Sequence, residues 1–268
     1  MNRRTGPGGG GRIEKPSLWW GQDGARSGAG NLGVPSRPMS ELSSEMAALA
    51  ERLGPAPGAV ARLVQFVAAE PGEGTSTLAR AFALEAARTA VRPVWLIELD
   101  LMRGEQHRLI SAAPDVYGLL GDPTRASPDH SMFFTVQPST DDQPGADAGF
   151  LAAYGVGRSG LYVTRFRRER LAPGQTARIL PSGAYWQALA ARSEYIVVDA
   201  PAWSRSHAAG ATAPFMDANL LVVSADVRRP QASTAVKRGV EAAGARWSGV
   251  VVNRAPKPPP RLLRSLAP

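Results

Sequence analysis

Residues 69–77, with the sequence AEPGEGTST, have the types and the spacing that could bind a phosphate group. A phosphate-binding loop has a small residue, four variable residues and then Gly-Lys-Ser/Thr. Here Gly72 and Gly74 permit a tight turn whose backbone N–H groups point inward, and a helix that starts near Ser76 adds partial positive charge for an anion. Ser76 stands where the hydroxyl ligand of Mg²⁺ belongs. The pattern therefore predicts a site for nucleotide phosphates and Mg²⁺.

One residue of this loop departs from the pattern, because Thr75 occupies the position of the lysine. That lysine supplies the cation that reaches the outer phosphates during phosphoryl transfer. Only three lysines occur in the chain, at positions 15, 237 and 257, so none is adjacent to the loop in sequence. Loss of such a cation costs several kcal/mol at the transition state, which is about a hundredfold or more in rate. We expect binding to survive this change better than catalysis, because the backbone N–H groups remain.

Two apolar runs downstream each end in carboxylates. Residues 94–104 read VWLIELDLMRG and place Glu98 and Asp100 at the end of a buried-strand pattern, while residues 195–201 read YIVVDAP and end on Asp199. Open α/β folds bind ligands at the carboxyl ends of their parallel strands. We therefore expect Ser76, Asp100 and Asp199 on the magnesium side of a bound nucleotide. If the protein is an active enzyme, Asp100 and Asp199 are its predicted catalytic residues.

With these motifs the chain resembles the bacterial tyrosine kinases (BY-kinases), cytoplasmic partners of capsule and exopolysaccharide export systems and relatives of the partition and division-site ATPases. The PGEGTS sequence at 71–76 is similar to the family's Pro-Gly-Glu-Gly-Lys-Ser loop, residues 98–100 to its second acidic motif and residues 199–201 to its third. The resemblance covers about residues 63–254 and implies a P-loop NTPase-like domain that binds ATP or ADP with Mg²⁺. The nucleotide-binding residues it implies are Gly72, Glu73, Gly74, Thr75, Ser76, Thr77 and Asn253, the last near adenine.

The departures from the family pattern bear on activity. Besides Thr75, Glu98 stands where the family has aspartate, and Met102 and Gly104 interrupt its Asp-x-Asp-x-Arg-Arg-Pro pattern. Residues 258–268 contain none of the tyrosines that these kinases autophosphorylate at their carboxyl end. Two hypotheses remain open. The first is a catalytically degenerate relative, a pseudokinase that acts through protein contacts; the second is an active ATPase or tyrosine autokinase, or a partition-type ATPase, that obtains its cation elsewhere.

Composition predicts one α/β domain with two polar tails. We interpret residues 1–40, rich in Gly, Arg and Pro, as a disordered tail, residues 41–255 as the P-loop NTPase-like domain and residues 256–268 as a basic, proline-rich tail. The chain has 268 residues and no cysteine, which suits the cytosol. It has no apolar run of about eighteen residues that could span a membrane. We therefore expect a cytoplasmic protein that can associate peripherally with the inner membrane.

The net charge of +8 is concentrated in the tails. Residues 1–40 carry six basic and two acidic side chains, and residues 254–268 carry four basic and none acidic, so the segment between them holds 21 of each sign. Basic tails suit an anionic membrane surface or an acidic partner, and a neutral core argues against a nucleic-acid partner. The resemblance implies an inner-membrane polysaccharide export or chain-length-regulating protein as partner. Homo-oligomers stay an open alternative, because the family's Glu-x-x-Arg-x-x-Arg oligomerisation pattern is not evident in the helix before the first strand.

Alternating apolar runs and helical patterns predict a mostly parallel sheet with helices on both faces. The segment 122–160 is rich in Asp, Pro, Gly and Ser and favours a long irregular insertion, with a partner-facing lid as one interpretation. Either 161–164 or 178–180 could form a further strand. The predicted helices are 40–53, 76–90, 182–192 and 230–244, and the predicted strands are 63–68, 93–99, 195–199, 219–224 and 248–252.

Four further features have plain alternatives. Arg80, one turn into the helix after the loop, could lend charge to a phosphate, but its side chain should lean over the outer surface of the turn. Residues 204–207 (SRSH) could form a switch loop, although a solvated loop is the simpler interpretation. The basic run 165–170 is typical of a solvated face, with an acidic-partner site as the sharper alternative. His107 and His207 have no second histidine or cysteine at ligand spacing, which disfavours a metal site.

Overall fold

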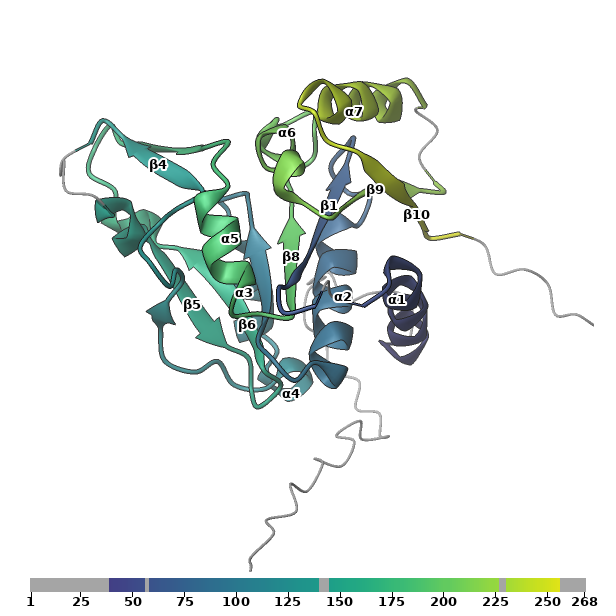
Figure 1. Cartoon of the computed structure of the whole chain (residues 1–268), viewed down its shortest axis with the longest axis horizontal. Coiled ribbons are helices and arrows are strands. Elements are labelled where there is room, and N and C mark those ends of the chain that lie inside the picture. Colours follow the sequence, from purple (N-terminus) through teal and green to yellow (C-terminus); the bar gives the residue numbers. More distant parts are fainter. Residues whose placement is uncertain (1–38, 56–57, 140–144, 227–229, 256–268) are drawn as a thin grey trace, which may run out of the picture. The chain divides into compact units, whose positions relative to one another are not determined.

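A computed structural model describes residues 39–55, 58–139, 145–226 and 230–255, all within one contact unit that spans Pro35–Pro268. Eight strands of this unit form one sheet in the order β10-β9-β1-β8-β2-β6-β5-β3 (Figure 1). The strands of this sheet are β1 (Arg62–Ala68), β2 (Val94–Glu98), β3 (Thr124–Arg125), β5 (Leu151–Gly155), β6 (Leu161–Phe166), β8 (Tyr195–Asp199), β9 (Ala218–Ser224) and β10 (Trp247–Asn253).

The sheet is mostly parallel, which confirms the predicted fold class. All neighbours from β10 through β6 pair in parallel, and only β6–β5 and β5–β3 are antiparallel. Strand β1 lies between β8 and β9, and its register places Phe66 opposite Asp199. Since parallel strands share their direction, the carboxyl ends of β1, β2, β8, β9 and β10 meet at one edge.

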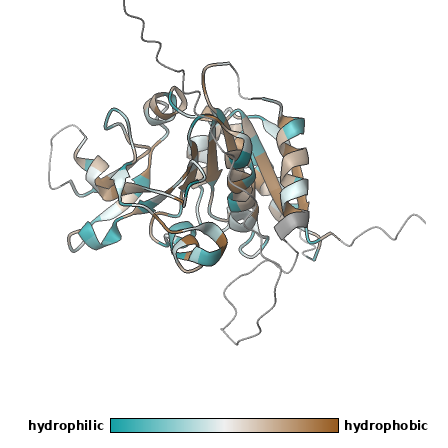
Figure 2. Ribbon diagram, turned by 90° about the horizontal axis from the view of Figure 1, so that it is seen from below, coloured by the Kyte–Doolittle hydropathy of each residue, from teal (hydrophilic) through white to brown (hydrophobic). Residues whose placement is uncertain are grey.

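Helices cover both faces of the sheet. On one face, α1 (Met39–Leu53), α2 (Thr75–Thr89), α3 (Glu105–Ser111) and α4 (Pro114–Tyr117) bury an apolar cluster that includes Phe66, Phe82 and Leu96. On the other face, α5 (Ala184–Ala190), α6 (Ala208–Thr212) and α7 (Pro230–Ala242) pack on a second cluster that includes Ile97 and Trp186. Figure 2 shows hydrophobic strands between helices in which hydrophobic and hydrophilic residues are mixed. This burial on both faces explains why the strands read as nearly continuous apolar runs.

The interpretation of 122–160 as irregular was wrong. Strand β5 pairs with β6 and extends the main sheet, while β4 (Phe134–Gln137) pairs with β7 (Thr176–Ile179) in a separate two-stranded sheet. Both alternatives for a further strand, 161–164 and 178–180, are therefore strands, in different sheets. The strands here are short and separated by Pro- and Gly-rich turns, so the composition of the turns obscured them. They form because Phe133 and Phe134 pack against the aromatic rings of α5 and β6.

The predicted tails fall mainly outside the described residues, so the division at 40 and 255 stays a prediction. Helix α1 begins at Met39, one residue before the predicted start. Three short 3₁₀ helices, η1 (Ala146–Phe150), η2 (Arg168–Arg170) and η3 (Ala213–Phe215), complete the described elements. Within the described part of the chain, no helix has the length and apolarity needed to cross a bilayer.

Candidate functional site

The loop between β1 and α2 has the backbone that a phosphate-binding loop requires. Gly72 and Gly74 have φ of 88° and 95°, in the left-handed region that favours glycine. Gly74 precedes α2, and the N–H of Leu78 donates to its carbonyl oxygen. A Cβ at position 74 would lie 2.0 Å from Nδ2 of Asn253. Glycine is therefore required here both by the backbone angle and by the approach of another strand.

Two side chains hold the shape of this loop. Asn253, at the end of β10, donates from Nδ2 to the carbonyl oxygen of Glu73 over 2.9 Å. The buried Glu73 carboxylate turns back inside the loop and accepts the N–H of Glu70 at 2.9 Å. Both residues were predicted to contact nucleotide, but neither lines the pocket described next. In this structure they position the loop backbone, and the contact of Asn253 with adenine stays a prediction.

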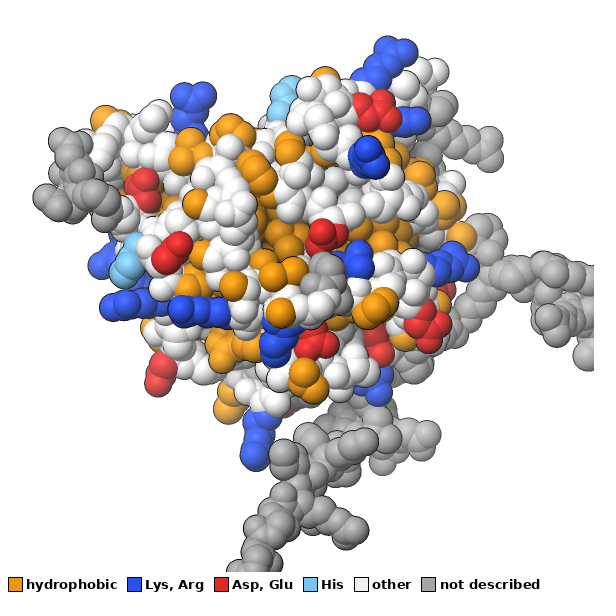
Figure 3. Space-filling model, in the orientation of Figure 1, with side chains coloured by type: hydrophobic (Ala, Val, Ile, Leu, Met, Phe, Trp, Pro, Cys, Tyr) orange, Lys and Arg blue, Asp and Glu red, His pale blue; other side chains and the backbone are white. Residues whose placement is uncertain are grey.

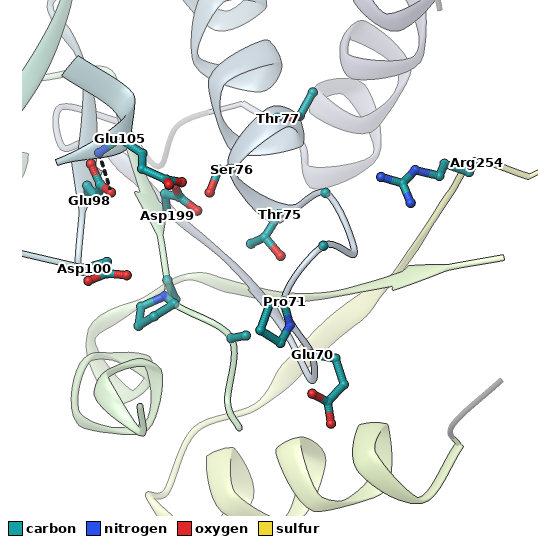
Figure 4. Close-up of a pocket in the computed structure, with 15 residues that line it drawn as sticks. Glu70, Pro71, Thr75, Ser76, Thr77, Glu98, Asp100, Glu105, Asp199 and Arg254 are labelled. Carbon is teal, nitrogen blue, oxygen red and sulfur yellow. Dashed lines mark hydrogen bonds between the residues drawn. The ribbon is translucent and has the colours of Figure 1, made fainter. Parts of the chain in front are cut away.

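A pocket of about 260 Å³ lies in front of the loop (Figure 4). It brings together Thr75, Ser76 and Thr77 with Asp100 and Asp199, as the sequence predicted. Glu105 and Arg254 also line it, and the motifs gave no sign of either. The full lining is Glu70, Pro71, Gly72, Gly74, Thr75, Ser76, Thr77, Glu98, Asp100, Glu105, Asp199, Ala200, Pro201, Ala202 and Arg254.

Asp199 is the most deeply buried carboxylate of the pocket, 3% exposed at the end of β8. Its Oδ2 accepts a hydrogen bond of 2.6 Å from Nε2 of Gln106, and burial raises its pKa to about 6. Its Oδ1 is buried and has no hydrogen-bond partner within the described structure. Figure 4 shows Ser76 beside this carboxylate. A buried oxygen without a partner next to a serine hydroxyl fits the donor set of Mg²⁺ and its bound water.

Glu98 has a structural role that the sequence did not reveal. Its two carboxylate oxygens accept the N–H groups of Glu105 and Gln106, each at 3.0 Å, and so cap the first turn of α3. Burial, together with the nearby charge of Asp199, raises the pKa of Glu98 to about 8. An aspartate would be one methylene shorter. Glu98, which stands where the family has aspartate, is therefore a residue whose carboxylate binds the amino terminus of α3.

Gln106 is the centre of the site's hydrogen bonds and has no exposed surface. Its Nε2 donates both to Asp199 and to the carbonyl oxygen of Ser76, at 2.6 and 2.9 Å. Its Oε1 accepts a hydrogen bond of 2.9 Å from the buried Arg80, whose guanidinium lies 5.8 Å above the ring of Tyr117. Arg80 thus supports Gln106 and does not line the pocket. No motif marks this glutamine, so only the tertiary contacts identify it.

Asp100 is engaged by arginines. It forms ion pairs with Arg205 and, at 3.8 Å, with Arg103, so the 204–207 loop meets the pocket at this carboxylate. Within the described ranges, no three His, Cys, Asp or Glu side chains could hold a metal ion by themselves. Mg²⁺ bound by Ser76, Asp100 and Asp199 would therefore need oxygens from a nucleotide's phosphates, which is the usual manner for this ion.

The charges that line the pocket are predominantly acidic. Five carboxylates face it, and Arg254 is the single basic side chain among the lining residues that the structure describes. A phosphate-binding site of this shape normally presents the opposite balance, with a lysine at the position of Thr75. The loop backbone is thus suited to phosphates, while the side chains around it favour binding only together with a divalent cation.

A parallel sheet with this loop after β1, and with carboxylates at the ends of β2 and β8, defines a P-loop NTPase-like domain. Among solved structures, bacterial tyrosine kinase domains are similar to it in fold. The VpsO kinase domain superposes with a TM-score of 0.55 at 20% identity over 81% of this chain and 96% of that one. The BceF tyrosine kinase domain gives 0.53 at 19% over 81% and 78%, and the kinase domain of the Escherichia coli tyrosine kinase ETK gives 0.50 at 16% over 81% and 74%.

These likenesses show that the chain has the fold of a BY-kinase domain, as its motifs predicted. No protein-family model and no curated protein matches the sequence. The property that this chain shares with these domains is therefore the fold.

Proposed function

We propose that this chain is a BY-kinase-like protein that acts in exopolysaccharide or capsule biosynthesis or export through protein–protein contacts. Its loop binds ATP or ADP weakly, with Mg²⁺, and turns ATP over slowly or not at all. The observation that carries this proposal is the pocket itself, in which the backbone of a phosphate loop faces five carboxylates and Thr75 stands in place of the lysine.

The electrostatics favour binding over chemistry. A nucleotide brings several negative charges toward Glu70, Asp100, Glu105 and Asp199, and each close pair of like charges opposes binding. The pKa of about 8 leaves Glu98 mostly protonated at neutral pH, so it adds little to this repulsion. Mg²⁺ would offset part of the remaining charge when bound between phosphates and protein. The lost lysine acts most strongly at the transition state, where charge on the phosphoryl group develops.

The cellular role rests on the fold and on the resemblance of the motifs. A protein with a BY-kinase fold and little turnover retains surfaces that can bind an inner-membrane polysaccharide export or chain-length-regulating protein. Peripheral attachment at the inner membrane and homo-oligomers belong to the same proposal. Figure 3 supports a protein partner over nucleic acid, because the basic and acidic side chains on the face that it shows are interspersed.

Calorimetric titration with ADP and ATP, with and without Mg²⁺, tests the binding part. We expect weak binding that requires Mg²⁺, phosphate release close to background and no phosphotyrosine on the protein. Robust ATP turnover that Asp100→Asn or Asp199→Asn abolishes would contradict the proposal and favour the active enzyme.

Complementation tests the cellular part. We expect deletion of the gene to lower polysaccharide output, and the Ser76→Ala variant to restore output as well as the natural sequence does. Crosslinking of the restored protein to an inner-membrane partner would support action through contacts. A Ser76→Ala protein that is folded and abundant but fails to complement would show that the loop's chemistry is needed.

A further inference from the structure

Arg254 is placed where a cation is otherwise missing. It follows the last residue of β10, lines the pocket and is the sole basic lining residue in the described part of the chain. Its φ is 56°, which is uncommon for a residue with a side chain. Residues held in sparsely populated backbone regions cluster at active sites and ligand clamps. None of the phosphate-loop motifs includes this residue, so it is an addition to the predicted site.

The backbone around Arg254 is fixed to the loop. Asn253 holds the carbonyl oxygen of Glu73 through Nδ2, and its Oδ1 accepts the N–H of Arg254 at 2.9 Å. Asn253 therefore attaches the end of β10 to the phosphate loop. The next residue, Arg254, carries the guanidinium. Figure 4 shows this guanidinium pointing toward the loop, on the opposite side of the loop from Glu98, Asp100 and Asp199.

The ion pair that Arg254 forms in the described structure is a weak one. Its side chain is 50% exposed, and Nη1 lies 3.9 Å from the exposed Asp226. An ion pair of this kind contributes little to stability, so the guanidinium can turn to a ligand at small cost. By contrast, Arg80 is buried against Gln106, and Arg205 is paired with Asp100.

We propose that Arg254 binds the phosphate chain of a nucleotide held at the loop, and so replaces part of the charge that the lysine provides elsewhere. This inference rests on the proposed function, because it needs a nucleotide at residues 72–77. A guanidinium presents paired N–H donors that match phosphate oxygens. It reaches the pocket from β10, not from α2, so it supports binding without restoring the catalytic geometry of a loop lysine.

Titrations with ADP and with inorganic pyrophosphate, both with Mg²⁺, test the proposal. We expect Arg254→Ala and Arg254→Gln to weaken binding of both ligands by about tenfold or more, the scale of one charge-assisted contact. Arg254→Lys should retain an intermediate affinity. The matched control is Arg238→Ala, which removes an exposed arginine from α7 outside the pocket and should leave both affinities within about twofold.

Pyrophosphate separates a phosphate contact from a contact with the base, because it lacks the base. A loss confined to ADP would overturn the proposal, as would equal affinities for the natural sequence and Arg254→Gln. Adding Thr75→Lys to Arg254→Ala should recover at least part of the lost affinity for both ligands. If the natural sequence binds neither ligand at millimolar concentration, the proposed nucleotide binding fails and this inference fails with it. If it binds and Arg254→Gln binds equally well, only the inference fails.

Discussion

The strand ends that carry acids differ from the strand end that carries a base. At the ends of β2 and β8, Glu98, Asp100 and Asp199 are each engaged by partners within the protein. At the end of β10, the ion-pair partner of Arg254 within the described residues is the exposed Asp226, at 3.9 Å. The acids are thus part of the folded structure whether or not a ligand binds, while the base remains available.

This difference changes how the carboxylates are interpreted. In an active P-loop enzyme such carboxylates serve a metal and its water. Here Glu98 caps α3 and Gln106 holds Asp199, so both side chains have contacts within the folded protein that need no ligand. A carboxylate at a strand end is therefore weak evidence of chemistry in this chain, and the unpartnered Oδ1 of Asp199 is the stronger sign.

Among changes near the carboxylates of the pocket, removal of Gln106 should cause the largest loss of stability. Gln106→Leu leaves the guanidinium of Arg80 and the carboxylate of Asp199 buried without their shared partner. We expect a loss of about 3–5 kcal/mol in the free energy of unfolding, measured by urea denaturation. Arg108→Leu, on an exposed position of the same helix, is the control. A loss below about 1 kcal/mol would indicate that Arg80 and Asp199 pair directly once the glutamine is gone.

The pKa of Glu98 predicts a pH dependence of stability. Its pKa is raised from 4.5 to about 8 in the folded protein, so the folded state binds the proton more tightly than the unfolded state does. The stabilisation is complete below pH 4.5 and is lost as the pH rises through 8. Between pH 6 and 9 we expect a loss of about 2–3 kcal/mol.

Urea denaturation across this pH range measures the effect. The Glu98→Gln variant, which cannot titrate at this position, should lose most of the slope. The same slope in both proteins would assign the pH dependence to other groups and would remove the argument that Glu98 is protonated at neutral pH.

A lysine at position 75 would change the charge balance of the pocket. We expect its effect to be smaller than those of the two changes above. Thr75→Lys places a cation opposite the acidic strand ends, and we expect ADP and ATP to bind about tenfold more tightly. Thr75→Met, which has length without charge, is the control and should not tighten binding. Hydrolysis should improve less, because Glu98 remains bound to the N–H groups of α3. Unchanged affinity would mean that the loop backbone does not bind phosphates.

The smallest expected effect is on ADP affinity when the partner of Arg254 is changed. Asp226→Asn removes the partner of Arg254, and because the pair is exposed we expect ADP to bind less than about threefold more tightly. Glu241→Gln removes the exposed partner of Lys237 on α7 and should change nothing. Weaker binding by Asp226→Asn would show that the aspartate holds Arg254 in its useful orientation.

Much of the fold was predictable because its signals are local. Each of the five predicted strands and four predicted helices has a counterpart whose ends differ by at most two residues. Apolar runs, helical periodicity and the glycines of the loop are properties of neighbouring residues. The antiparallel addition of β5 and β3 was missed because short strands between polar turns carry little periodicity, and their pairing with β6 depends on contacts distant in sequence.

The sequence by itself determined the loop, the absence of its lysine and the carboxylates at two strand ends, because each is written in consecutive residues. Only the tertiary structure decided what those groups contact. It joined Gln106 to Asp199 and Ser76, directed Glu98 to the amide groups of α3 and brought Arg254 to the pocket from a strand 180 residues away from Glu73. Such contacts depend on how separate elements pack, and packing depends on the whole apolar core and not on any one segment.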